Sequence, residues 1–219
     1  MPKVLSRVDK VREMRLSSNN VSTKKAADTP QLFQMICQPS HEYLAFPRVS
    51  SQNRRYIPMT FLSSDDICGD KLIIIPDANF YIFGVLMSNV HNAWMRIVAG
   101  RLKSDYSYSS SVYNSFPFPT PDDHQKSKIE QSAEAIIKAR NLFPDSSLSD
   151  LYDERLMPPE LRKAHQNNDR AVMEAYGFDW RTMTESECVA ELFKLYQQLV
   201  EREKASEGEK KGKRGKKND

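Results

Sequence analysis

The stretch VYNSFPFPTP, residues 112–121, separates two parts of the sequence that differ in character. Pro117, Pro119 and Pro121 stand at every second position, and proline can neither donate a backbone hydrogen bond nor continue a helix. The residue before a proline is also restricted to extended backbone. We therefore expect a final strand here that runs into a linker, with one domain before the linker and another after it.

The part before the linker combines segments of strand character with helices. Three segments rich in β-branched and aromatic residues predict strands: EYLAFPRVS (42–50), RRYIPMTFL (54–62) and KLIIIP (71–76). Apolar side chains at helical spacing predict one helix over residues 80–102, ended at Gly100 or shortly after, and another over residues 4–15. Residues 1–121 are therefore expected to form a small mixed α/β domain.

The part after the linker has helical periodicity. A helix is predicted over residues 125–142, and a second over residues 157–177, which begins with prolines and ends at a glycine. Thr184 and Glu187 form a capping-box pattern ahead of a third helix. The expected architecture is thus α+β, with a helical bundle over residues 122–205. Residues 206–219 are expected to be a disordered basic tail.

Composition limits the class of protein. Hydrophobic residues make up 39% of the 219 residues and charged residues 28%, which is typical of a soluble globular protein. The longest apolar run, residues 80–90, is well short of the roughly 20 residues that a membrane span needs. Cys37, Cys68 and Cys188 are far apart and lack the spacing of a zinc or redox site, so we expect reduced thiols in a cytoplasmic protein.

Charge is unevenly distributed along the chain. Residues 1–121 carry 14 Lys and Arg against 9 Asp and Glu, whereas residues 122–209 carry 12 against 19. The last ten residues, KKGKRGKKND, add six cations and one acid. This asymmetry favours a first half that faces nucleic acid and an acidic second half.

No motif of an enzyme active site is found in the sequence. None of the seven glycines has the G-x-G spacing of a phosphate-binding loop, and the D/N-P-P-Y/F tetrad of amino-methyltransferases is missing. His91 and His165 are interpreted as hydrogen-bonded packing residues. We predict no catalytic residue, metal site or cofactor site on this chain, and expect it neither to transfer methyl groups, nor to cut DNA, nor to bind S-adenosylmethionine.

Two polar clusters remain distinctive. The first, called the 101–106 cluster, follows the helix predicted over residues 80–102, and the second, the 50–55 cluster, lies in a predicted turn between strands. Hydroxyls and cations contact phosphates, while Lys, Arg and Asp can also read base edges in the major groove. The candidate DNA-binding residues are Arg101, Lys103, Ser104, Asp105 and Tyr106 in the first cluster, and Ser50, Ser51, Arg54 and Arg55 in the second.

Several segments, in order along the chain, resemble the C-terminal part of MmeI-like (type IIL) restriction-modification enzymes and related N6-adenine DNA methyltransferases. They are FPRVSSQNRRYIP, IPDANFYIFGVLMSNVHNAWMRIVAGRLKSDYSYS, VYNSFPFP, FPDSSLSDLYD and MPPELRKAHQNNDRAVMEAYGF. The resemblance implies a target recognition domain followed by a helical C-terminal domain. It also implies that S-adenosylmethionine is bound by a methyltransferase domain elsewhere in the parent polypeptide, which can carry a nuclease domain as well.

The resemblance makes double-stranded DNA, in the bacterial cytoplasm, the expected partner of the chain. Lys103 and Asp105 lie two positions apart, so on an extended loop both side chains would point the same way and could read the two bases of one G·C pair. The resemblance supports this expectation, because the family places base-reading residues in the 101–106 stretch. Arg101, Ser104, Tyr106 and the 50–55 cluster would then hold the DNA backbone. Alternatively, Lys103 and Asp105 form a surface ion pair. The whole chain could also be a protein-interaction module, or a complete enzyme for which no catalytic set is visible.

Overall fold

The structure is a computed structural model that describes residues 1–215, with side chains described up to residue 205. The chain divides into two compact units, Met1–Pro39 and Ser40–Asp219. The expected boundary near residue 121 therefore lies inside the second unit. The tail expected over residues 206–219 lies partly in the last helix, which ends at Gly215, and its last four residues lie outside the described residues. Its disorder stays a prediction.

The first unit is helical, and one buried arginine holds its segments together by hydrogen bonds. Its elements are α1 (Pro2–Leu16), α2 (Val21–Lys25) and a short 3-10 helix η1 (Ala26–Asp28), so that the helix predicted over residues 4–15 is confirmed. Arg15, near the end of α1, is 8% exposed. Its guanidinium donates to the backbone carbonyls of Ala26 (2.7 Å), Thr29 (3.0 Å) and Leu32 (2.8 Å). The fixed fork of N–H donors thus ties the loop after η1 to α1.

The second unit contains two small antiparallel sheets. The first sheet has the order β3-β1-β4 and the second the order β2-β6-β5. Their strands are β1 (Tyr43–Pro47), β2 (Val49–Ser50), β3 (Thr60–Leu62), β4 (Leu72–Pro76), β5 (Gly100–Leu102) and β6 (Asp105–Ser107). Arg48 joins the sheets, because its N–H donates to the carbonyl of Lys71 and its carbonyl accepts from the N–H of Tyr108, both at 2.8 Å.

The predicted strands form only in part. Residues 43–47, 49–50 and 72–76 are in strands, so the segment expected as one strand over 42–50 is divided at Arg48, and the segment 54–62 contributes only its last three residues. Tyr56, Ile57 and Met59 instead bury their side chains in the core, each at most 2% exposed. Pro58 between them has no N–H to donate to a ladder, which favours packing over strand pairing.

The helix predicted over residues 80–102 is two helices and a strand. α3 (Phe80–Leu86) and α4 (Asn89–Val98) are separated at Ser88, which has an extended backbone and whose side-chain Oγ caps α4 by accepting a hydrogen bond from the N–H of His91. Serine side chains favour such caps over helix interiors because they bond to nearby backbone groups. The strand predicted just before the prolines is also wrong, since Ser110–Asn114 forms the short helix α5.

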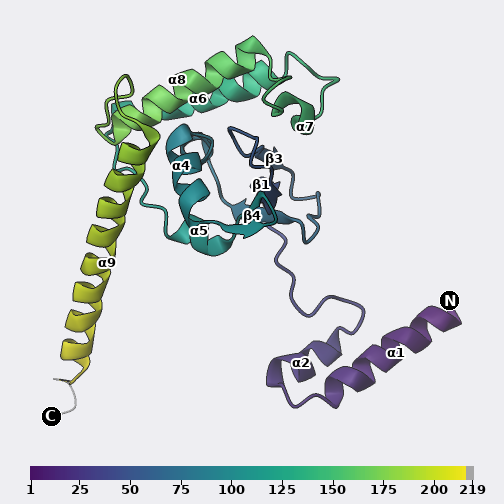
Figure 1. The fold of residues 1–219 in the computed structure, drawn as a ribbon. Helices are drawn as coiled ribbons and strands as arrows, with labels where there is room; N and C mark the ends of the chain where they lie inside the picture. The colour runs from purple at the N-terminus through teal and green to yellow at the C-terminus, as the bar shows by residue number, and fades with distance from the viewer. Residues whose placement is uncertain (216–219) are drawn as a thin grey trace. The chain divides into compact units, whose positions relative to one another are not determined.

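The C-terminal part is helical, as predicted. Its elements are α6 (Asp123–Arg140), α7 (Leu148–Leu151), α8 (Pro159–Ala175) and α9 (Glu185–Gly215). The capping box of Thr184 and Glu187 is present, and Gly177, at φ +73°, follows α8 in the left-handed conformation that favours glycine. α6 and α8 lie side by side (Figure 1). Both pack on α3, whereas α9 packs on α4. Helices from before the linker therefore complete the expected bundle.

Two close contacts bind the helical part to the rest of the unit. Gly84 of α3 allows close approach of α6 and α8, because a Cβ atom there would lie 2.7 Å from Ile129 Cγ2. Asn168 of α8 donates to the Gly84 carbonyl at 2.7 Å. On the other side, Trp94 of α4 is 1% exposed and its ring lies 4.9 Å from that of Phe193 in α9. One core thus spans both sides of the linker.

Two buried histidines confirm the interpretation of His91 and His165 as packing residues. His91 bonds the Leu86 carbonyl and the Tyr108 hydroxyl, both at 2.8 Å, and burial lowers its pKa to about 4. His165 contacts the Tyr152 hydroxyl at 2.7 Å, and burial, with the nearby charge of Arg140, lowers its pKa well below the usual value. Both imidazoles are therefore neutral at pH 7.

The buried groups predict that acid destabilises the fold. Between about pH 4.5 and 6 the two histidines bind protons in the unfolded chain but not in the folded one, which favours unfolding. Asp169 acts the other way, because burial raises its pKa from 3.8 to about 6 and only the folded state holds its proton. The net difference of one proton should lower the free energy of unfolding by about 1.4 kcal/mol per pH unit as the pH falls.

Urea denaturation at a series of pH values measures this slope. Asp169→Asn removes the one group whose proton uptake in the folded state opposes that of the histidines in the unfolded state. The free energy of unfolding should then change with pH about twice as steeply between pH 4.5 and 6, whatever the variant's stability at pH 7. An equal slope in both proteins would contradict the assignment of the titrating groups.

Candidate nucleic-acid interface

The 101–106 cluster forms a β-hairpin. β5 and β6 pair from Gly100↔Ser107 to Leu102↔Asp105, which leaves Lys103 and Ser104 as a two-residue loop. Lys103 has φ +57°, the conformation that the first residue of a type II′ turn requires and that glycine adopts without strain. A lysine in this position is uncommon, and its side chain is exposed at the end of the hairpin.

Arg101 is held against the hairpin by two contacts. Its guanidinium lies 3.8 Å from the centre of the Tyr106 ring, the residue opposite it on β6, and its Nη1 donates to the Ser104 carbonyl at 2.9 Å. Tyr106 is only 8% exposed. Arg101 is therefore an exposed cation with a fixed position, whereas Tyr106 serves as its support.

The structure brings the two clusters together. β2 pairs with β6 so that Ser50 lies opposite Tyr106, although 56 positions separate them in the sequence. In addition, the backbone N–H of Gln52 donates to Asp105 Oδ1 at 3.3 Å. The turn that follows β2 thus lies beside the start of β6, and the carboxylate of Asp105 links the two.

Two expectations about Lys103 and Asp105 change. Lys103 lies in a tight turn and Asp105 begins a strand, so the expected extended loop is wrong, because the hairpin closes with only two residues. The alternative, a surface ion pair between these two side chains, is also wrong. The structure describes both side chains, and no ion pair joins them. Lys103 is exposed, and Asp105 is half-buried beside Gln52.

The residues of the 50–55 cluster differ in exposure. Ser50 is 4% exposed, so its hydroxyl is not presented to solvent, and Ser51 accepts from the N–H of Asn53 at 3.3 Å. Arg54 donates to Ser149 Oγ at 2.9 Å. Arg55 is exposed, and its guanidinium lies 5.7 Å from the Tyr56 ring centre. The two arginines are thus the members of the cluster best able to contact a phosphate.

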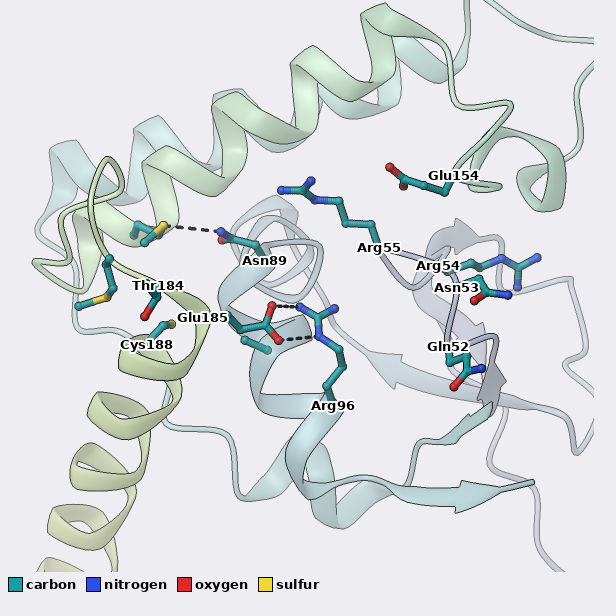
Figure 2. A pocket seen from close by; sticks show the side chains of 13 residues that line it. Gln52, Asn53, Arg54, Arg55, Asn89, Arg96, Glu154, Thr184, Glu185 and Cys188 are labelled. Atoms are coloured by element: carbon teal, nitrogen blue, oxygen red, sulfur yellow. Dashed lines mark hydrogen bonds and ion pairs between the residues drawn. The ribbon is translucent and has the colours of Figure 1, made fainter. Parts of the chain in front are cut away.

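A cavity of about 530 Å³ adjoins the turn after β2 (Figure 2). The turn residues from Gln52 to Arg55 form one side of it, and the start of α9, with Thr184, Glu185 and Cys188, forms the opposite side. Arg96 of α4 also lines the cavity and makes two hydrogen bonds to the Glu185 carboxylate, at 2.9 and 2.8 Å. Sequence reasoning missed Arg96, which lies in an apolar helix without any local pattern.

Neither a metal site nor a membrane span is present among the residues that the structure describes. In that part of the chain, no three His, Cys, Asp or Glu side chains are grouped so that they could hold a metal ion. None of the described helices is both long enough and apolar enough to cross a membrane.

Comparisons with known proteins place this arrangement in a family. Residues 1–120 match the family model of the MmeI target recognition domain, and residues 121–202 match that of the MmeI C-terminal domain. DNA methyltransferase A of Bacillus subtilis (strain 168) is 36% identical over 202 residues, which cover 92% of this chain and 23% of that protein. A solved structure of the type IIL restriction-modification enzyme MmeI in complex with DNA matches with a TM-score of 0.78 and 46% identity, covering 90% of this chain and 26% of that one.

These matches define a target recognition domain followed by a helical C-terminal domain. The chain belongs to the MmeI family of restriction-modification enzymes and DNA methyltransferases. It spans about a quarter of the length of the two relatives.

Proposed function

We propose that this chain is the sequence-specific double-stranded DNA recognition module of a restriction-modification DNA methyltransferase. The observation that carries the proposal is the joining of two polar clusters, distant in sequence, by the β2–β6 pairing and by the bond from Gln52 to Asp105. Basic and hydroxyl side chains for phosphates thereby lie next to side chains able to read a base edge. The match to an enzyme solved with DNA supports the same function.

The proposed roles follow from chemistry and exposure. Lys103 donates to the N7 and O6 atoms of guanine, and Asp105 accepts from the N4 amino group of the paired cytosine. Arg101 and Ser104, exposed on the hairpin, contact the DNA backbone, as do Ser51, Arg54 and Arg55 on the turn. Ser50 and Tyr106, both buried, hold the hairpin and the turn in place.

Methyl transfer is assigned to parts of the enzyme that this chain does not span. The methyltransferase part would bind S-adenosylmethionine, whose sulfonium group carries a positive charge. The 530 Å³ cavity does not fit that cofactor, because its two glutamates, Glu154 and Glu185, are already paired with arginines, while Arg54 and Arg55 form no ion pair and would repel the sulfonium cation. We therefore propose that the chain positions the methyltransferase part, and a nuclease part where one exists, on DNA in the bacterial cytoplasm.

The salt dependence of DNA binding tests the proposal. Arg54→Ala with Arg55→Ala should weaken binding to all duplexes alike, because phosphate contacts carry no sequence information. The slope of log K against log salt should flatten by up to about 2, at roughly 0.9 for each phosphate that is no longer neutralised. Fluorescence anisotropy with labelled duplexes at several salt concentrations measures both effects.

A matched control removes two exposed cations elsewhere. Lys126→Ala with Lys163→Ala changes the net charge equally but alters exposed residues of α6 and α8 that do not line the cavity beside the turn, so the slope should stay close to that of the native chain. If both double variants flatten the slope equally, binding depends on total charge alone. If the native chain binds a partner protein without salt dependence and no duplex, the protein-interaction alternative holds instead.

A further inference from the structure

A second cavity continues the first along α8. Its volume is about 190 Å³, and it shares Arg55, Asn89 and Met173 with the 530 Å³ cavity. It adds Arg170 of α8 and Trp180 of the loop before α9 to the lining. The two cavities together, called the arginine groove below, lead from the turn of the 50–55 cluster onto the C-terminal helical domain.

The carboxylates of the arginine groove already have partners. Glu154 pairs with Arg162 at 2.7 Å, and Glu185 pairs with Arg96 at 2.8 Å. Asp169 accepts hydrogen bonds from the Tyr56 hydroxyl at 2.7 Å and from the N–H of Asn89 at 2.8 Å. Glu154 and Glu185 are therefore neutralised by ion pairs, whereas Asp169, which accepts only from neutral donors and has a pKa raised to about 6 by burial, keeps its negative charge above that pH.

The cations of the arginine groove are not neutralised in this way. Among the described residues, no ion pair involves Arg54, Arg55 or Arg170. Three guanidinium groups that form no ion pair thus line two adjoining cavities, although the charges of Asp169 and Glu154 still act on Arg55. Although the helical domain is acidic as a whole, the cations in this groove retain a positive field that an anionic ligand can use.

Trp180 lies beside two arginines, of which Arg170 lines the groove and Arg181 does not. The guanidinium of Arg170 lies 4.2 Å from the centre of the indole ring, and that of Arg181 lies 4.9 Å from it. Stacking on an aromatic ring restricts a guanidinium but leaves its N–H donors at the edge available for hydrogen bonds. Such pre-ordered donors suit the oxygens of a phosphate, which accept two N–H groups at once.

We propose that the arginine groove binds the sugar–phosphate backbone of the DNA that flanks the recognition site, with Arg55 and Arg170 as the principal contacts. The inference rests on the proposed function and extends the DNA-binding surface onto the C-terminal domain. DNA is favoured over an acidic peptide because the groove begins at the turn whose Gln52 is hydrogen-bonded to Asp105 of the base-reading hairpin. A strand held by the hairpin can therefore continue into the groove.

Duplexes with different flanks test the proposal on the full chain. The duplexes carry the site selected from a random library by the native chain, with ten extra base pairs on one side, the other side or neither. The native chain should gain affinity from one of the two extensions. Arg170→Ala should lose most of this gain, and its salt slope on that duplex should fall by about 0.9. The side of the gain identifies the strand that enters the groove.

Three comparisons make the result specific. Arg170→Lys retains the charge and should keep the slope, whereas Lys163→Ala, an exposed cation on the same helix, should keep both the slope and the gain. Equal gain and equal slope in Arg170→Ala and the native chain would overturn the proposal while leaving sequence recognition by the hairpin intact. Tighter binding of oligoglutamate than of DNA, abolished in Arg170→Ala, would overturn it in favour of an acidic peptide. Failure of the native chain to bind any duplex at low salt would refute the proposed function and this inference together.

Discussion

Exchanging the charges of the hairpin, by Lys103→Glu with Asp105→Arg, is expected to invert base preference at one position of the DNA site from G·C to C·G. Glutamate would accept from the cytosine amino group, and arginine would donate to guanine N7 and O6 on the opposite strand. Discrimination at that position should shift by about 1 to 3 kcal/mol, with other positions unchanged. Competition binding on duplexes that differ in one base pair measures the shift.

The backbone at Lys103 provides the control for this exchange. Lys103→Gly should relieve the strain of φ +57° and stabilise the hairpin by up to about 1 kcal/mol, because glycine adopts this conformation freely. The same variant should lose preference at the position that Lys103 reads. A variant that becomes more stable and keeps its full base preference would show that the lysine side chain has no part in recognition.

Replacing Trp94 by alanine is expected to destabilise the second unit by about 3 to 5 kcal/mol. The indole is 1% exposed and lies against Phe116, Phe193 and Tyr196, with ring centres 4.9 to 6.4 Å away. Its removal leaves a large cavity between α4 and α9. Thermal and urea unfolding measure the loss, and amide hydrogen exchange should show the first turns of α9 opening before α6 and α8.

Trp94→Phe separates packing from hydrogen bonding at the same site. The indole Nε1 is buried and has no hydrogen-bond partner among the described residues. Phenylalanine keeps an aromatic ring and removes this unsatisfied donor, so the loss should be much smaller than for alanine. Equal losses in the two variants would mean that the ring contacts with α9 contribute little.

The local elements of the fold could be predicted from the sequence because their causes are local. Prolines at 117, 119 and 121, the glycine at 177 and the capping pair Thr184 and Glu187 each act on neighbouring backbone. The break at Ser88 was missed because the apolar spacing continues across it, while the serine hydroxyl starts a new helix. Periodicity alone does not distinguish one long helix from two that share a buried face.

For the candidate site, the sequence predicted which residue types and clusters are involved but not how they are arranged in space. The sequence singled out both polar clusters, but the pairing of Ser50 with Tyr106 depends on a long-range contact that no local pattern encodes. The same contact buries Ser50, whose type indicated an exposed phosphate ligand. Arg170 was missed because it lies in an acidic helical segment, and only the folded chain brings it near Arg55 through a shared cavity lining.

The most direct test of sequence recognition is a binding selection with the native chain on a random duplex library, read by sequencing at moderate salt. We predict that a short motif is enriched over several rounds, that it contains at least one strongly preferred G·C pair, and that this pair alone changes to C·G when the Lys103→Glu, Asp105→Arg variant is used. Enrichment of no motif, although the chain binds duplexes in a salt-dependent manner, would contradict the account and leave a non-specific DNA-binding domain.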